Sequence, residues 1–191
     1  MADPTDQELI NSVLQGQTAS FEPLVVKYQP RVFALARRYA RREDEVEDIV
    51  QTVFLKAYSK LSSYKGTAPF EHWLMRTATY TCYDFLRKHQ RNREWNATDL
   101  SDEENDWFEN MGEESSAHTD HAAARALVDK LLDELKPEER HIITLLELER
   151  KSIREIADLT GLNESNVKVK AHRARDKMRK AVARLTLEKY L

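Results

Sequence analysis

A stretch near the C-terminus, residues 152–175, constrains the fold more than any other part of this 191-residue chain. Ser152 and Glu155 have the spacing of a capping box, which starts a helix. Gly161 can supply the left-handed residue that ends it, and Asn163 can cap a second helix. Two short helices joined by a glycine-containing turn are typical of a helix-turn-helix motif, whose second helix enters the major groove of DNA.

The second of these helices is expected to have one apolar face and one basic face. Val167, Ala171, Ala174 and Met178 recur at helical spacing and form the apolar face. The other face carries Asn166, Lys168, Lys170, His172, Arg173 and Arg175. Together with the capping box and the glycine turn, this one-sided basic face favours binding to a DNA groove over a solvated helix on a bundle.

Composition excludes several classes of protein. Only 4 Gly and 5 Pro among 191 residues argue against an all-β fold with many turns. No apolar run approaches the roughly 18 residues that cross a membrane, and the N-terminus lacks the pattern of a signal peptide. The single cysteine, Cys82, excludes an internal disulfide and is typical of a reducing cytoplasm. We therefore expect an all-α protein located in the cytoplasm.

The formal net charge of −3 conceals two segments of opposite charge. Residues 163–191 contain nine Lys and Arg against three Asp and Glu, whereas residues 94–120 contain ten Asp and Glu and no Lys or Arg. The acidic segment shows no sustained periodicity, which predicts a flexible linker. Within it, Trp107, Phe108 and Met111 could dock as a short anchor. His118 and His121 lack a third ligand nearby, so we expect no metal site.

These observations divide the chain into two small helical domains joined by the acidic linker. The expected boundaries are 1–92 for an N-terminal helix bundle, 93–121 for the linker, and 122–191 for a four-helix domain that contains the helix-turn-helix. In the bundle, helical periodicity predicts helices at about 6–15, 20–41 and 43–61, and a fourth that opens at Pro69.

The third predicted helix, at about 43–61, has two distinct faces. An acidic stripe that includes an exposed leucine suits a partner helix, although scattered exposed leucines are common in any protein. The stripe consists of Asp44, Asp48, Gln51 and Leu55. The inward face consists of Val46, Ile49, Val50, Val53, Phe54, Ala57, Tyr58 and Leu61.

The fourth predicted helix places Cys82 among its inward residues, where it is expected to act as a small hydrophobe. A different face alternates arginines with aromatic rings, a pattern that can stack unpaired bases while it neutralises phosphates. The same pattern also arises when tyrosines half-bury against a bundle and arginines are solvated. This face consists of Arg76, Tyr80, Tyr83 and Arg87.

Three segments in a fixed order resemble the extracytoplasmic-function (group IV) sigma factors of the sigma-70 superfamily. One segment resembling the family's core-polymerase-binding helix is EDEVEDIVQTVFLKAYSKL. The segment resembling its helix for the promoter −10 element is APFEHWLMRTATYTCYDFLRKH. The segment resembling its −35 helix-turn-helix is LKPEERHIITLLELERKSIREIADLTGLNESNVKVKAHRARDKM. The resemblance covers nearly the whole chain and implies a factor that initiates transcription without an active site.

The resemblance also implies roles for the faces described above. Residues implied to bind core polymerase are Asp44, Asp48, Gln51 and Leu55. Residues implied to bind the −10 element lie in the base-capturing loop at 62–68 and on the helix after it, and are Ser63, Tyr64, Lys65, Arg76, Tyr80, Tyr83 and Arg87. Residues implied to face the base edges or phosphates of the −35 element, or to start the recognition helix, are Asn166, Lys168, Val169, Lys170, His172, Arg173 and Arg175.

The partners implied by the resemblance are RNA polymerase core, promoter DNA and an anti-sigma factor, which is often membrane-anchored in this family. On the polymerase, the implied contacts are the clamp coiled coil of the largest subunit and the flap. No cofactor and no direct membrane insertion are implied. Tyr80 stands where the family commonly has Asn, and Thr52, Asn166 and Val169 also depart from frequent residues. The promoter sequence is therefore not carried over.

Two other functions stay open at the level of sequence. One is a stand-alone regulator that binds duplex DNA as a dimer, and the other is a decoy that sequesters an anti-sigma factor. The absence of a dimerisation coiled coil counts against the first, and the basic recognition helix counts against the second.

A separate hypothesis concerns the linker, whose carboxylates could occupy the basic channel that nascent RNA later follows.

Overall fold

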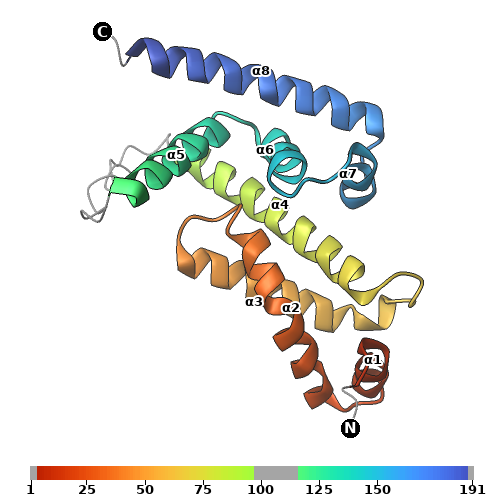
Figure 1. The fold of residues 1–191 in the computed structure, drawn as a ribbon. Coiled ribbons are helices and arrows are strands. Elements are labelled where there is room, and N and C mark those ends of the chain that lie inside the picture. The colour runs from red at the N-terminus through yellow and green to blue at the C-terminus, as the bar shows by residue number, and fades with distance from the viewer. Residues whose placement is uncertain (1–3, 97–115, 189–191) are drawn as a thin grey trace. The chain divides into compact units, whose positions relative to one another are not determined.

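The computed structural model describes residues 4–96 and 116–188, and both stretches are predominantly helical (Figure 1). No β-strand occurs within these described residues, which confirms the all-α prediction. The residues group into two compact units, the first built on residues up to Leu86 and the second on most residues from Arg87 onward. The α-helices are α1 (Asp6–Leu14), α2 (Glu22–Ala36), α3 (Glu43–Ser59), α4 (Phe70–Asn96), α5 (Ser116–Asp133), α6 (Pro137–Ile143), α7 (Ile153–Thr160) and α8 (Glu164–Glu188).

The hydrophobic core of the first unit draws side chains from α1, α2, α3 and α4. Ile10 of α1, Leu24 of α2, Val53 of α3 and Leu74 of α4 are each at most 1% exposed. Burying an aliphatic side chain of this size contributes about 1.5–3 kcal/mol. The apolar periodicity along the N-terminal half therefore determines which face of each helix turns inward and which faces stay exposed.

Helix α2 is shorter than the predicted helix at about 20–41. A 3-10 turn (Thr18–Phe21) precedes it, and α2 itself ends at Ala36. After Ala36 the chain turns tightly, with the Arg38 amide donating to the Leu35 carbonyl (3.0 Å) and the Tyr39 amide to the Ala36 carbonyl (2.8 Å). Tyr39 is still only 2% exposed, so the apolar spacing continues through a turn that is not α-helical.

Helix α3 begins with three acidic residues, which interact favourably with the positive end of the helix dipole. Its predicted inward residues are buried, with one exception. Tyr58 was expected in the core, but its side chain is 41% exposed. That expectation is wrong because the Tyr58 ring packs edge-on against Phe21, with ring centroids 5.2 Å apart, on the wall of an open groove. After α3, Leu61 is buried in a 3-10 turn (Leu61–Ser63).

Helix α4 starts directly after Pro69, as predicted, and buries Cys82 to 1% exposure. It continues to Asn96, and α5 begins at Ser116, so helices occupy both ends of the segment predicted as linker. The centre of that segment, including Trp107, Phe108 and Met111, lies outside the described residues. In the part of the chain that the structure describes, no helix combines the length and apolarity needed to span a membrane.

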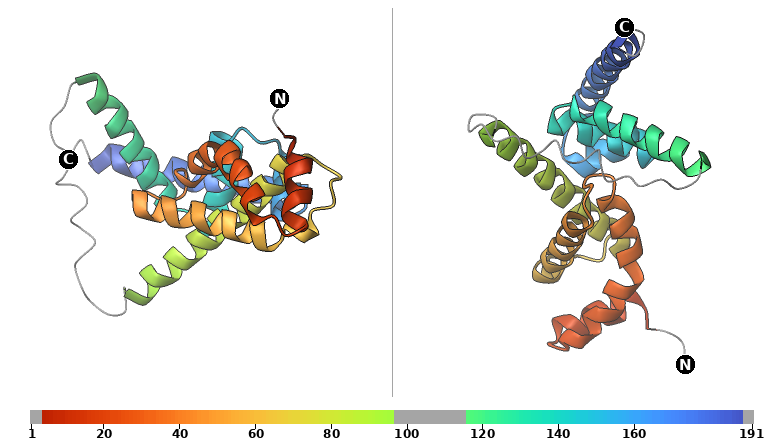
Figure 2. Two further views of the ribbon diagram at one scale, coloured as in Figure 1. Left: turned by 90° about the horizontal axis from the view of Figure 1, so that it is seen from below. Right: turned by 90° about the vertical axis from the view of Figure 1, so that its left-hand side faces the viewer.

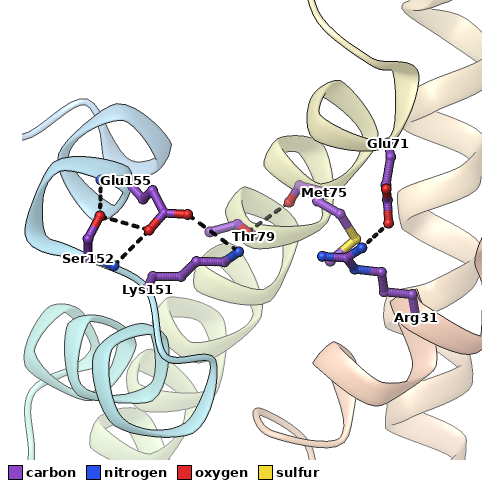
Figure 3. A network of polar contacts seen from close by, with 7 residues as sticks. All are labelled: Arg31, Glu71, Met75, Thr79, Lys151, Ser152 and Glu155. Atoms are coloured by element: carbon purple, nitrogen blue, oxygen red, sulfur yellow. Dashed lines mark hydrogen bonds and ion pairs between the residues drawn. The ribbon is translucent and has the colours of Figure 1, made fainter.

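The helix-turn-helix of the second unit has the capping contacts that the sequence predicts (Figure 3). The Glu155 amide donates to the Ser152 Oγ (3.2 Å), and the Ser152 amide donates to the Glu155 carboxylate (2.8 Å). Gly161 has a φ of +72°, in the left-handed region that ends α7. The Asn166 amide then donates to the Asn163 side chain (2.8 Å) and caps α8. These contacts confirm the predicted capping box and turn.

Helix α8 is long and continuous, and its first half packs on α6 and α7 (Figures 1 and 2). Val167 and Ala171 join Ile142, Leu145 and Ile156 in one buried cluster. One turn later, Ala174 joins a second cluster with Leu132 of α5. Between α6 and α7 lies a π-helical turn (Thr144–Leu148). This packing buries the apolar face of α8 and leaves its opposite face exposed.

Candidate nucleic-acid interface

The predicted partner stripe on α3 is solvent-exposed throughout. Leu55, an aliphatic side chain, is 63% exposed between polar neighbours. Asp48, Gln51 and Leu55 line a groove of about 610 Å³, whose remaining walls are mostly apolar. Asp44 does not line it. Its carboxylate pairs with Arg42, and the hydrogen bond from that guanidinium holds the pKa of Asp44 below its ordinary value. The structure thus brings three of the four predicted residues together.

Sequence reasoning placed this surface on α3 alone and missed the wall that α2 supplies. Val25, Gln29 and Phe33 of α2 also line the groove. Their spacing of four residues puts them on one helical stripe, a signal that was available in the sequence. Phe21, Val50, Phe54 and Tyr58 complete the apolar part of the lining. The result is an apolar groove with acidic residues at its rim, formed largely by two helices that follow one another in the sequence.

The loop before α4 is held by its own hydrogen bonds. The Ser63 hydroxyl donates to the Lys60 carbonyl (2.6 Å), and the Tyr64 hydroxyl donates to the Ala68 carbonyl (2.6 Å). The Tyr64 ring is half-buried and lies 5.7 Å from the Trp73 ring, centroid to centroid. Lys65 is exposed. Tyr64 therefore shapes the loop from beneath, while Ser63 and Lys65 lie at its surface.

The arginine and tyrosine face of α4 lies beside a second, smaller groove of about 240 Å³. Arg76 and Tyr80 both line it, and the Arg76 guanidinium lies 5.9 Å from the centre of the Tyr80 ring. Tyr80 is 38% exposed, which leaves part of its ring available for stacking. Farther along the helix, Tyr83 is half-buried and Arg87 is exposed. Of the predicted residues on this face, only Arg76 and Tyr80 are brought together at the groove.

Two lysines, Lys56 of α3 and Lys60 directly after that helix, contribute to this groove and were missed in the sequence. Both line it together with Arg76. The Lys56 ammonium donates to the Thr81 hydroxyl (3.3 Å) and pairs with Asp84 (3.4 Å). Their spacing of four residues was visible, but two lysines at a helix C-terminus are already explained by the helix dipole. Three cationic side chains and two aromatic rings, Trp73 and Tyr80, therefore surround one groove.

The outward face of α8 contains two kinds of basic residue. Asn166, Lys168, Val169, His172 and Arg173 are all exposed, as predicted. Lys170 and Arg175 instead form ion pairs within the second unit, with Glu138 (2.5 Å) and Glu147 (2.6 Å). Lys168 lies 4.0 Å from Glu164, one turn earlier on the same helix. The face combines side chains suited to base edges with cations that are already partly neutralised.

Polar side chains buried in α6 help to hold α8 in place. The Glu139 carboxylate accepts from the Lys177 ammonium (2.7 Å) and from the Lys136 amide (3.1 Å). Although burial raises the pKa of Glu139, these hydrogen bonds lower it below its ordinary value overall. Burial also lowers the pKa of His141 to about 4, so its imidazole is neutral at pH 7. Within the described residues, no group of three His, Cys, Asp or Glu side chains is arranged to hold a metal ion.

Two family models match the chain, and they coincide with the two groups of surfaces. Sigma-70 region 2 matches residues 24–92, which include the smaller groove and, except for Phe21, the lining of the larger one. Sigma-70 region 4 matches residues 125–178, which include the helix-turn-helix. The ECF RNA polymerase sigma-E factor of Escherichia coli K12 is 33% identical over 177 residues, which cover 90% of this chain and 91% of that protein. This chain belongs to the ECF sigma factors of the sigma-70 family.

Three further proteins extend the comparison. The RNA polymerase sigma-H factor of Pseudomonas aeruginosa is 29% identical over 188 residues, 96% of each chain. CnrH, solved in complex with the cytosolic domain of CnrY, shares the fold with a TM-score of 0.59 at 24% identity, over 93% of this chain and 97% of that one. RpoE of Bartonella quintana, solved with the anti-sigma factor NepR, gives a TM-score of 0.57 at 23% identity, over 85% and 96%. An ECF sigma factor acts in transcription initiation, in agreement with the function that the sequence predicts.

Proposed function

We propose that this sigma factor binds RNA polymerase core through the stripe on α3 and the groove between α2 and α3. The observation that carries this proposal is Leu55, which is 63% exposed on the wall of an apolar groove whose rim is acidic. Burying such a leucine in a partner contributes about 1.5–3 kcal/mol. Asp48 and Gln51 supply polar contacts around it, and Asp44 adds negative charge one turn earlier. The clamp coiled coil of the largest subunit is the proposed partner, and the flap is proposed for the second unit.

The two remaining surfaces are proposed to hold promoter DNA. The loop with Ser63 and Lys65 and the α4 face with Arg76 and Tyr80 bind the −10 strand as it opens. Tyr64, Tyr83 and Arg87 support or extend this surface. Capturing a base that has left the stack stabilises the open duplex, since the contact forms only after unstacking. No step makes or breaks a covalent bond.

The exposed face of α8 is proposed to read the −35 element in the major groove. Val169, His172 and Arg173 face base edges, and Lys168 faces phosphate. Asn166 lies at the start of the helix, where recognition helices make many of their base contacts. The proposed domains are 1–92 and 122–191, with an acidic linker at 93–121. The protein works in the cytoplasm, and an anti-sigma factor holds it inactive by covering the exposed apolar surface.

Core binding separates this proposal from a stand-alone regulator. Leu55→Asp is expected to weaken binding of the full chain to sigma-free core polymerase by at least tenfold, because it places a charge against an apolar partner surface. Val26→Asp is the matched control, since Val26 is 58% exposed on α2 but does not line the groove. Competition against a labelled sigma factor measures both affinities. Equal affinities for the two variants would contradict the assignment of this surface.

A further inference from the structure

Two cations on α8 are held by carboxylates that come from other elements of the second unit. The Lys170 ammonium pairs with Glu138, in the first turn of α6, at 2.5 Å. The Arg175 guanidinium donates through two nitrogens to one oxygen of Glu147, at 2.6 and 3.1 Å. Glu147 lies in the π-helical turn between α6 and α7. Both contacts join residues about thirty positions apart, so the fold creates them.

Arg173 differs from these two cations. It is exposed on the same helix, and among the described residues no carboxylate forms an ion pair with it. Lys168 has only the 4.0 Å contact with Glu164. The N-terminal half of α8 therefore presents cations that are free to bind DNA beside cations that are neutralised. Each neutralised cation is paired with a carboxylate that is itself partly exposed to solvent.

We propose that Glu138 and Glu147 restrain the sequence-independent affinity of this protein for duplex DNA. Phosphate contacts by Lys and Arg supply most of the non-specific binding energy, whereas base-edge contacts supply discrimination. With Lys170 and Arg175 paired internally, a bound duplex gains little from them unless an ion pair opens first. The discriminating contacts of Arg173 and its neighbours then make up a larger share of the total. This inference rests on the proposed role of α8 at the −35 element.

The side chains of both ion pairs are partly exposed to solvent, so each pair is of modest strength and can be opened by a single substitution. Lys170 and Glu138 have side chains that are 26% and 39% exposed, and Arg175 and Glu147 are 53% and 49% exposed. Partly exposed pairs are of modest strength, so replacing either carboxylate by its amide is expected to tighten duplex binding about threefold. Each released cation is also expected to steepen the dependence of log affinity on log salt by about one unit.

The test measures binding of the full chain to a random-sequence duplex of about thirty base pairs at several salt concentrations. The variants are Glu138→Gln and Glu147→Gln, and the control is Glu134→Gln. Glu134 pairs with Arg184 at 2.5 Å. Arg184 lies on α8, nine residues beyond Arg175. All three changes remove one carboxylate charge and break one ion pair with α8. The inference predicts tighter binding and a steeper salt slope for the first two variants relative to the control.

A double-variant comparison shows whether each carboxylate acts through its own cation. In a Lys170→Met background, Glu138→Gln is expected to give no gain, because the cation that it would release is absent. A gain that persists there, or equal effects of all three Glu→Gln changes, would overturn the inference. Thermal melting checks that every variant folds. If Glu138→Gln does not fold, Glu147→Gln provides a second, independent test.

Failure of the inference can be told from failure of the proposed function. Duplexes enriched by the wild-type chain from a random pool are compared with the unselected pool. The proposed −35 role predicts that Arg173→Ala abolishes the preference for the enriched duplexes. The inference predicts that Glu138→Gln and Glu147→Gln tighten binding to both pools by the same factor. Loss of the first result overturns both proposals, whereas loss of only the second overturns the inference alone.

Discussion

The side chains that α8 exposes differ in what they can recognise in DNA. A guanidinium can bind two acceptors on one guanine edge, whereas a lysine mainly binds phosphate as a point charge. Val169, which is 47% exposed, can contact only apolar groups such as the thymine methyl. Arg173 is therefore the side chain on this face with the greatest power to discriminate between bases.

Replacing Arg173 by Ala is expected to slow initiation about 10- to 100-fold on promoters that carry a −35 element. A good bidentate contact between arginine and guanine is worth about 1–3 kcal/mol. Arg179→Ala is the control, because Arg179 is exposed on the same helix and pairs with Asp176 one turn earlier. Initial rates of transcription on templates with and without the −35 element measure the effect. Equal losses on both templates would contradict a role in reading the −35 element.

The role proposed for Tyr80 at the −10 element depends on its aromatic ring. Stacking of a base on an aromatic side chain is worth about 1–3 kcal/mol. Tyr80→Ala is therefore expected to reduce strand opening, while Tyr80→Phe keeps the ring and opens the duplex almost normally. Permanganate reactivity of −10 thymines in the polymerase complex measures opening. If the Phe variant lost as much reactivity as the Ala variant, stacking would not be the contribution of Tyr80.

At the scale of elements, α6 links the buried polar residues of the second unit to the placement of α8. His141 lies in this helix and is 3% exposed. Burial lowers its pKa from the ordinary 6.5 to about 4 in the folded protein. Between these two values the unfolded chain binds more protons than the folded one. The stability that the neutral His141 imidazole contributes is therefore fully present above about pH 6.5 and is lost progressively as the pH falls through this window.

The second unit is expected to lose about 3 kcal/mol of stability from this group when the pH falls from 7 to 4. Urea unfolding at several pH values measures the loss. His141→Leu removes the titrating group while keeping an apolar side chain at the site, so its stability should depend less on pH over this range. An unchanged pH dependence in that variant would show that other groups cause the loss.

Some elements follow from local sequence, and others require the tertiary fold. The capping box at Ser152 and the left-handed Gly161 are local signals, and both are present in the structure. The pairing of Lys170 with Glu138 was not predictable, because the two residues are 32 positions apart. The exposure of Tyr58 was missed for a related reason. Helical periodicity places it at the edge of the buried face, and only the packing of α2 decides whether that edge is covered.

The grooves show the same division between local and tertiary information. The stripes on α3 and on α2 were each visible from their spacing, yet only the packing of the two helices shows that both stripes line one groove. Lys56 and Lys60 were present in the sequence as an ordinary basic helix end. That they line one groove with Arg76 depends on how α3 and α4 pack in the first unit. Side chains on one helix were therefore predictable as a set, and surfaces shared by two helices were not.

At the scale of the whole molecule, function is divided among surfaces that carry different charge. Residues 163–191 are strongly basic, the segment at 94–120 is strongly acidic, and the formal net charge of the chain is only −3. Local charge decides which partner binds which surface. The apolar groove with its acidic rim suits a protein partner, while the basic groove and α8 suit nucleic acid. The proposed function uses all of these surfaces, because it assigns one to polymerase and the others to two promoter elements.

The most direct test of this account is transcription by the purified chain with sigma-free core polymerase on a pool of bacterial genomic fragments, followed by sequencing of the RNA 5′ ends. The account predicts start sites that share two spaced upstream motifs and that disappear with Leu55→Asp but persist with Val26→Asp. An absence of such start sites, under conditions where the same core initiates with another sigma factor, would contradict it.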